Sequence, residues 1–201
     1  MKLMITRHAQ TRNNEEGRTH DEKLPTEITE EGFLQIKRLI GRLKKEKISR
    51  MICSDLDRCR MTAKEIMLEI HSDIEYTPLI REKENGDFGG MKHKDINWDG
   101  LKGDFETRKA PNGESLIEVR ERARKFFSEL LEKHGDSDET ILMISHGAFL
   151  KVFIGDLLGM NLHDSIFKLF VEHCSLSEIE INPKYKAGYQ MRFLNEKDFL
   201  N

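Results

Sequence analysis

The sequence predicts an α/β protein, a three-layer α/β/α sandwich around a mainly parallel central sheet. Short apolar runs, each typical of a buried strand, alternate with longer segments that repeat apolar residues at helical spacing. In such a pattern the helices cover both faces of a parallel sheet. We find no internal repeat and no linker, so the 201 residues predict a single domain over 1–201.

The first half of the chain supplies two strands and two helices. Lys2–Thr6 is a short apolar run that ends in an Arg-His pair. Thr29 is a candidate helix N-cap, and the residues after it have the spacing of an amphipathic helix over 30–46. Met51–Cys53 forms a second strand, followed by helical spacing over 59–70 and an extended stretch from Tyr76 that ends at Glu82.

The second half of the chain repeats this alternation and then closes the sheet. Apolar residues at helical spacing predict a helix over 116–130, and Ile141–Ile144 is a fully apolar strand. A helix follows over 150–157. Two further strands, over 176–181 and 191–194, complete the predicted sheet.

Residues 83–113 interrupt the alternation of strands and helices. This stretch has no apolar periodicity, and it contains several glycines and a proline. A loop of this length in a compact domain is usually functional. We therefore predict a lid-like insertion at about 83–113.

Composition excludes several classes of function. The formal net charge is -3 and no tract of five or more basic residues occurs, so we expect no nucleic-acid partner. No apolar run approaches the ~18 residues that cross a bilayer, so we expect no membrane partner and a cytoplasmic location. The three cysteines contain no C-x-x-C pair, and we expect neither a disulfide framework nor a structural metal. Whether the chain forms a homodimer stays open.

Polar side chains follow four of the predicted strands at their carboxyl ends. In open α/β sheets these ends lie at one edge, where ligands bind. Histidines, arginines and a carboxylate should therefore converge there. The segments concerned are Arg7–His8, Ser54–Arg58, Arg81–Glu82 and Ser145–His146.

These residue types suit the transfer of a phosphoryl group. Arginine forks hold the phosphate oxygens, an unprotonated imidazole nitrogen can attack phosphorus, and a carboxyl group can protonate the leaving alkoxide. Taken singly, each candidate also fits a structural role. Arg58 alone is typical of a solvated helix, and Glu82 of a surface carboxylate, with Glu84 an equal alternative. Their shared position at one sheet edge favours a site for a small phosphorylated molecule.

Several short motifs, in order from residue 1 to about 158, resemble the signatures of the histidine phosphatase superfamily, the phosphoglycerate mutase-like proteins. The segment 5–14, ITRHAQTRNN, is similar to the Arg-His-Gly signature, with Ala9 in place of the usual glycine. The stretch Glu22–Ile28 is longer than the common loop at that place. The remaining matching segments are Thr29–Gly32, Ser54–Ala63, Ile80–Gly90, Gly113–Ser115 and Ser145–Gly147.

The resemblance implies a role for each matching residue. His8 would be the nucleophile and Glu82 the proton donor. Arg7, Arg58 and His146 would form the phosphate pocket and take part in catalysis. The resemblance further implies substrate contacts for Asn14, Thr11 and Gly147, and it implies neither a metal nor a cofactor.

Three functions follow, of which the first is preferred. The family contains phosphatases, which hydrolyse the phosphohistidine, and mutases, which return the phosphoryl group to the substrate. The compact stretch between Glu82 and His146 favours a phosphatase acting on a small phosphorylated metabolite over a cofactor-dependent phosphoglycerate mutase. A regulatory phosphate-binding protein is the non-enzyme alternative. A metal module of His8, His20 and His146 matches no standard spacing.

We expect the insertion at 83–113 to choose the substrate, because loops on a rigid scaffold commonly carry specificity. Its cationic residues would hold a second acidic group, and its aromatic residues would cover the substrate body. The residues concerned are Lys92, Lys94, Lys102, Arg108, Lys109, Trp98 and Phe105.

Overall fold

A six-stranded sheet forms the centre of the protein. The computed structural model describes residues 1–20 and 26–200. The strand order is β3-β2-β4-β1-β5-β6, with parallel ladders from β3 to β1 and antiparallel ladders from β1 to β6. The strands are β1 (Lys2–Arg7), β2 (Arg50–Ser54), β3 (Asp73–Thr77), β4 (Thr140–Ser145), β5 (Leu176–Ile181) and β6 (Tyr189–Glu196).

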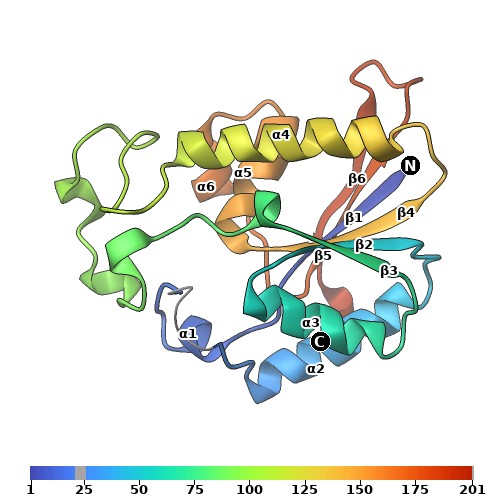
Figure 1. The fold of residues 1–201 in the computed structure, drawn as a ribbon, viewed down its shortest axis with the longest axis horizontal. Helices are drawn as coiled ribbons and strands as arrows, with labels where there is room; N and C mark the ends of the chain where they lie inside the picture. Colours follow the sequence, from blue (N-terminus) through green and yellow to red (C-terminus); the bar gives the residue numbers. More distant parts are fainter. Residues whose placement is uncertain (21–25, 201) are drawn as a thin grey trace.

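Helices cover both faces of this sheet, which confirms the predicted three-layer sandwich. Figure 1 shows α2 and α3 below the sheet, and α4, α5 and α6 above it. Within the described ranges, none of the helices combines the length and hydropathy that a membrane crossing requires. The helices are α1 (Arg12–Glu15), α2 (Glu30–Leu43), α3 (Asp57–Met67), α4 (Leu116–His134), α5 (Gly147–Leu157) and α6 (Leu162–Lys168).

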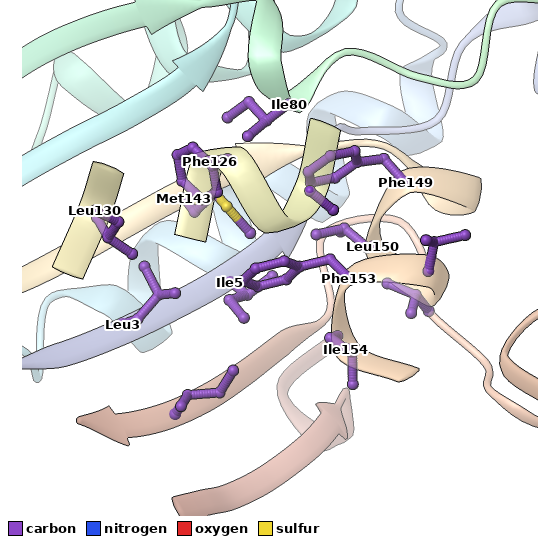
Figure 2. Packing of buried hydrophobic residues seen from close by; sticks show 14 of the residues in the cluster. Leu3, Ile5, Ile80, Phe126, Leu130, Met143, Phe149, Leu150, Phe153 and Ile154 are labelled. Atoms are coloured by element: carbon purple, nitrogen blue, oxygen red, sulfur yellow. The ribbon is translucent and has the colours of Figure 1, made fainter. Parts of the chain in front are cut away.

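Two hydrophobic clusters separate the layers, one on each face of the sheet. Because side chains alternate along a strand, Leu3 and Ile5 point to one face and Met4 to the other. The first cluster packs strand residues against α4 and α5, where Phe149 and Phe153 are fully buried (Figure 2). The second packs β1, β2 and β4 against α2 and α3. The strand ends are therefore fixed from both sides.

The helix boundaries follow local sequence signals. The Thr29 hydroxyl accepts a 3.0 Å hydrogen bond from the Gly32 amide, which confirms the predicted N-cap of α2. α2 ends at Leu43 and α3 at Met67, both earlier than expected. The short helices α1 and α6 were not predicted, since four and seven residues are too few for a helical repeat to show.

The stretch 83–113 extends beyond the sheet on the same side as α1 (Figure 1). It is less irregular than predicted, since it contains the 3₁₀ turns η2 (Gly86–Phe88), η3 (His93–Asp95) and η4 (Trp98–Gly100). Its two ends are joined by backbone hydrogen bonds, and a Cβ at Gly86 would lie 2.1 Å from the Pro111 carbonyl oxygen. Gly86 therefore permits a close approach of two chain segments at the base of the loop.

Candidate active site

A cavity of about 530 Å³ opens where β1 and β4 end. Its wall comes from the end of β1, helix α1 and the residues 18–20 after it, the start of α5, helix α6 and the stretch 83–113. Five predicted site residues line it, namely Arg7, His8, Asn14, Glu82 and Gly147. Three others are buried and do not line it, namely Thr11, Arg58 and His146.

His8 is held with one defined ring nitrogen available. Its Nδ1 lies 2.8 Å from the Ala9 carbonyl oxygen. Because a carbonyl oxygen only accepts, Nδ1 carries the proton and Nε2 keeps its lone pair. The His8 amide also donates to the Ser145 carbonyl oxygen at 2.9 Å, so β4 fixes the backbone of the nucleophile candidate.

His146 lies beside His8, with 5.2 Å between the ring centroids, but both of its nitrogens contact other protein groups. Arg58 Nε donates to Nδ1 at 3.0 Å, which places the proton on Nε2. Nε2 then donates to Ser54 Oγ at 2.7 Å. The contact of His146 and Arg58 with phosphate stays a prediction.

Arg58 and His146 are buried, whereas an arginine at such a position is typical of a solvated helix. The structure leaves only 3% of Arg58 and none of His146 exposed. Both belong to a hydrogen-bonded network under the cavity floor. Their loss must therefore affect stability as well as any chemistry.

Arg7 and Gly147 meet at the cavity wall. Arg7 Nη1 donates to the Val171 carbonyl oxygen at 3.0 Å, and no protein group accepts from its buried Nε among the described residues. A Cβ at Gly147 would lie 3.1 Å from Arg7 Cζ. Gly147 therefore leaves room for the guanidinium at the first residue of α5.

Glu82 is bound to the N-terminus of α5. Its carboxylate accepts from the Ala148 amide at 3.2 Å, the Phe149 amide at 3.0 Å and the Lys83 amide at 2.9 Å. A helix N-terminus favours a carboxylate at this position. Glu84 is exposed and does not line the cavity, so the geometry favours Glu82 of the two acid candidates.

Thr11 and Asn14 were both expected to contact the substrate, and of the two only Asn14 lines the cavity. Thr11 Oγ1 caps α1 and donates to Asn14 Oδ1 at 2.8 Å, with 1% of the residue exposed. His20 Nε2 lies 2.8 Å from the same hydroxyl and must donate to it. Asn14 alone reaches the cavity. Thr11 therefore organises the wall, and a direct substrate contact is not what this geometry favours.

His8 and the three histidines beside it, His20, His146 and His173, are neutral rings. Burial, followed by the charge of Arg58, holds the pKa of His8 and of His146 well below the usual value. Burial also lowers the pKa of His20 and of His173 to about 3. At neutral pH the positive charge of the site therefore comes from arginine and lysine.

The sequence did not indicate several residues of the cavity lining, nor His173, which contacts the His8 backbone without lining the cavity. His173 donates from Nδ1 to the His8 carbonyl oxygen at 2.9 Å, although 165 positions separate them. No local pattern marks it. The cavity wall includes Arg18, Lys83, His93 and Lys151.

The stretch 83–113 reaches the cavity with fewer basic residues than expected. Trp98, Phe105 and Arg108 line the cavity. The expectation was wrong for Lys92, Lys94, Lys102 and Lys109, which do not. The loop Glu22–Ile28 falls largely outside the described residues, which omit 21–25.

The histidines do not gather into a metal-binding arrangement in the described part of the chain. No group of three or more histidine, cysteine, aspartate or glutamate side chains there has the geometry to hold a metal ion. His8 lies 5.8 Å from His20 and 5.2 Å from His146, centroid to centroid. The alternative metal module gains no support from this geometry.

The fold and the cavity define an α/β protein whose parallel strand ends hold histidines and arginines around one carboxylate. Comparison with known families agrees with that class. The profile described as "Histidine phosphatase superfamily (branch 1)" matches residues 3–194. The chain belongs to this superfamily.

Individual relatives and structures extend along nearly the whole chain. The "Adenosylcobalamin/alpha-ribazole phosphatase" of Escherichia coli (strain K12) is 26% identical over 204 residues, covering 98% of this chain and 97% of that protein. The "Probable phosphoglycerate mutase GpmB" of Escherichia fergusonii is 27% identical over 186 residues, covering 90% and 85%. The structure of the alpha-ribazole phosphatase from Shigella flexneri superposes with a TM-score of 0.86 at 26% identity, covering 98% and 97%.

Proposed function

We propose that the protein is a phosphatase that acts on a small phosphorylated metabolite through a phosphohistidine at His8. Membership of the superfamily and the phosphatase names among its relatives support this proposal. The observation that carries it is the orientation of His8, whose Nδ1–H is bound by the Ala9 carbonyl oxygen. A neutral imidazole with a free Nε2 lone pair, beside the Arg7 guanidinium, is a nucleophile suited to phosphorus.

The proposed reaction has two steps. In the first, His8 Nε2 forms a bond to phosphorus while the bond from phosphorus to the substrate oxygen breaks, and the Glu82 carboxyl gives its proton to that oxygen. In the second, water attacks phosphorus, its proton returns to Glu82, and the nitrogen–phosphorus bond breaks to release inorganic phosphate. Arg7 and Arg58 would stabilise the charge on the phosphoryl oxygens.

Release of phosphate from a generic aryl phosphate tests this proposal directly. We expect turnover without bisphosphoglycerate, and loss of turnover in His8→Ala. A metabolite panel should then include alpha-ribazole phosphate and the phosphoglycerates, which the names of the relatives suggest.

Two outcomes would favour the other functions. Interconversion of phosphoglycerates that depends on bisphosphoglycerate would indicate a mutase, for which the name of the Escherichia fergusonii relative is the specific support. Phosphate binding without turnover of any ester on the panel would indicate a regulatory binding protein.

A further inference from the structure

The cavity carries more positive charge than one phosphate monoester requires. Among its described lining residues, the cationic side chains outnumber the single carboxylate of Glu82. A phosphate monoester supplies only about two negative charges at neutral pH. The cations of the lining are Arg7, Arg18, Lys83, Arg108 and Lys151.

Two of these cations are already paired outside the cavity. Arg18 Nε lies 2.9 Å from Glu16 Oε2, and Arg108 Nη1 lies 2.6 Å from Asp99 Oδ1. The positive charges of Arg18 and Arg108 are therefore balanced by protein carboxylates. Arg7 faces the proposed phosphoryl site next to His8.

Lys83 and Lys151 differ from these arginines. Neither has a carboxylate within ion-pair distance among the residues that the structure describes. Lys151 Nζ donates to the Ile166 carbonyl oxygen at 3.0 Å, and Lys83 Nζ lies 4.8 Å from the centroid of the Trp98 ring. Both line the cavity, from α5 and from the start of the stretch 83–113.

Burial without a carboxylate partner has an energetic consequence. It lowers the pKa of Lys83 and of Lys151, because water that would solvate the ammonium is excluded. A ligand carboxylate or phosphate placed against them would restore the charged form and gain charge-assisted hydrogen bonds.

We propose that the natural substrate carries a second acidic group, a carboxylate or a further phosphate, which Lys83 and Lys151 bind while the transferred phosphoryl group lies at His8. This inference rests on the proposed phosphatase function and narrows its substrate class. The contact with a second acidic group, expected from the sequence at Lys92, Lys94, Lys102 and Lys109, is thereby assigned to Lys83 and Lys151, which line the cavity.

Matched aryl esters test the subsite. Phenyl phosphate is compared with 3- and 4-carboxyphenyl phosphate and with their methyl esters, and 1,3- and 1,4-phenylene bisphosphate extend the test to phosphate. We expect KM to be about tenfold or more lower for at least one doubly acidic ester, since the second acidic group gains charge-assisted hydrogen bonds to the lysines. Lys83→Met and Lys151→Met should each remove this preference, so that the KM ratio between the acidic ester and phenyl phosphate approaches one. Lys102→Met, at an exposed position off the cavity, is the matched control.

Two results would overturn the subsite. One is equal KM values for acidic and neutral esters in the wild-type protein, and the other is an equal change for all esters in both lysine variants. If phenyl phosphate itself is not hydrolysed, the proposed function fails instead. Calorimetric binding of the same esters to His8→Ala then still measures the lysine preference, and the absence of that preference would refute the subsite alone.

A different set of contacts concerns the nucleophile itself. His173 precedes β5 and donates from Nδ1 to the His8 carbonyl oxygen at 2.9 Å, with 5.2 Å between the ring centroids. The next amide, of Cys174, donates to the Arg7 carbonyl oxygen at 3.0 Å. His8 is thus bound at its amide by β4, at its carbonyl by His173 and at its ring by Ala9.

We infer that His173 is a positioning residue that fixes the backbone of His8 and thereby the direction of its Nε2. Burial keeps the ring neutral, with its pKa lowered to about 3, and the His8 carbonyl oxygen fixes its single proton on Nδ1. A displacement of a nucleophile by about 1 Å can cost ~10²-fold in rate. The residue should therefore act on kcat more than on KM.

Two substitutions separate positioning from simple packing. In His173→Asn the side-chain amide can donate in place of Nδ1–H, whereas His173→Leu keeps the volume but has no donor. We expect kcat to fall about tenfold or more in His173→Leu and to be largely restored in His173→Asn, with KM little changed in both. Equal losses in the two variants, or normal kcat in His173→Leu, would refute the role. Thermal unfolding shows whether each variant is folded. If His173→Leu does not fold, His173→Asn, which retains a donor, is compared with the wild-type protein alone, and a kcat close to that of wild type is expected.

Discussion

Replacement of Glu82 by glutamine should separate its structural contribution from its proposed chemistry. The carboxylate accepts three backbone amides, two on Oε1 and one on Oε2. An amide oxygen can keep the first two as neutral bonds, but the amide nitrogen would face the Ala148 N–H donor to donor. The substitution therefore weakens two contacts and breaks the third.

The size of the stability loss follows from these contacts. Weakening two charge-assisted bonds by about 1 kcal/mol each and losing the third predicts roughly 2–4 kcal/mol, and partial exposure of Glu82 reduces this to about 1–3 kcal/mol. The change in the free energy of unfolding is measured by urea denaturation of Glu82→Gln against wild type. Glu84→Gln, on an exposed side chain away from the cavity, is the matched control and should lose less than about 0.5 kcal/mol.

The catalytic effect should depend on the leaving group. General acid catalysis contributes about 10²–10⁴-fold, so alkyl phosphates, whose alkoxide needs the proton, should lose that much in kcat/KM. A nitrophenyl phosphate needs little protonation and should lose less than about tenfold. Equal losses for alkyl and aryl esters would refute the role of Glu82 as acid, and so would a leaving-group dependence that appears in Glu84→Gln instead.

Two further predictions concern the buried network and the histidines. Arg58→Ala and His146→Ala should each lower kcat by about 10²–10³-fold, and each should also destabilise the protein by about 2–4 kcal/mol because a buried partner is left without its hydrogen bond. Near-normal kcat at saturating substrate would remove the residue from the site. Acid should weaken the fold, since the folded pKa of His20 and His173 is about 3 while the ordinary value is 6.5. Below pH 6.5 these two imidazoles bind protons in the unfolded chain but stay neutral in the folded chain. The free energy of unfolding therefore falls by up to about 1.4 kcal/mol per pH unit for each histidine. Urea denaturation at pH 7.5 and 5.0 measures this, and an unchanged midpoint would contradict it.

The fold was predictable because its signals are local and repetitive. Buried strands such as Ile141–Ile144 carry continuous apolar runs, and α2 begins at a Thr29 cap that the sequence displays. The convergence of Arg7, His8 and Glu82 also followed, since parallel strands end at one edge of a sheet.

The remaining features of the site depend on tertiary contacts that no local pattern encodes. His173 reaches His8 only because β5 pairs with β1, and Lys151 looks like any helical lysine until α6 is placed against α5. The orientation of His146 is likewise set by Arg58 and Ser54, 88 and 92 positions away. Charge alone could not distinguish Arg108, which lines the cavity, from Lys102, which does not.

The proposed function depends on turnover through a phosphohistidine at His8. The most direct measurement is to quench the enzyme during turnover of a phosphorus-labelled ester, and to follow the protein-bound label in acid and in alkali. We expect a label that acid removes and alkali retains, that maps to His8 by mass spectrometry, and that is absent in His8→Ala. A label that survives acid, or that persists in His8→Ala, would contradict it.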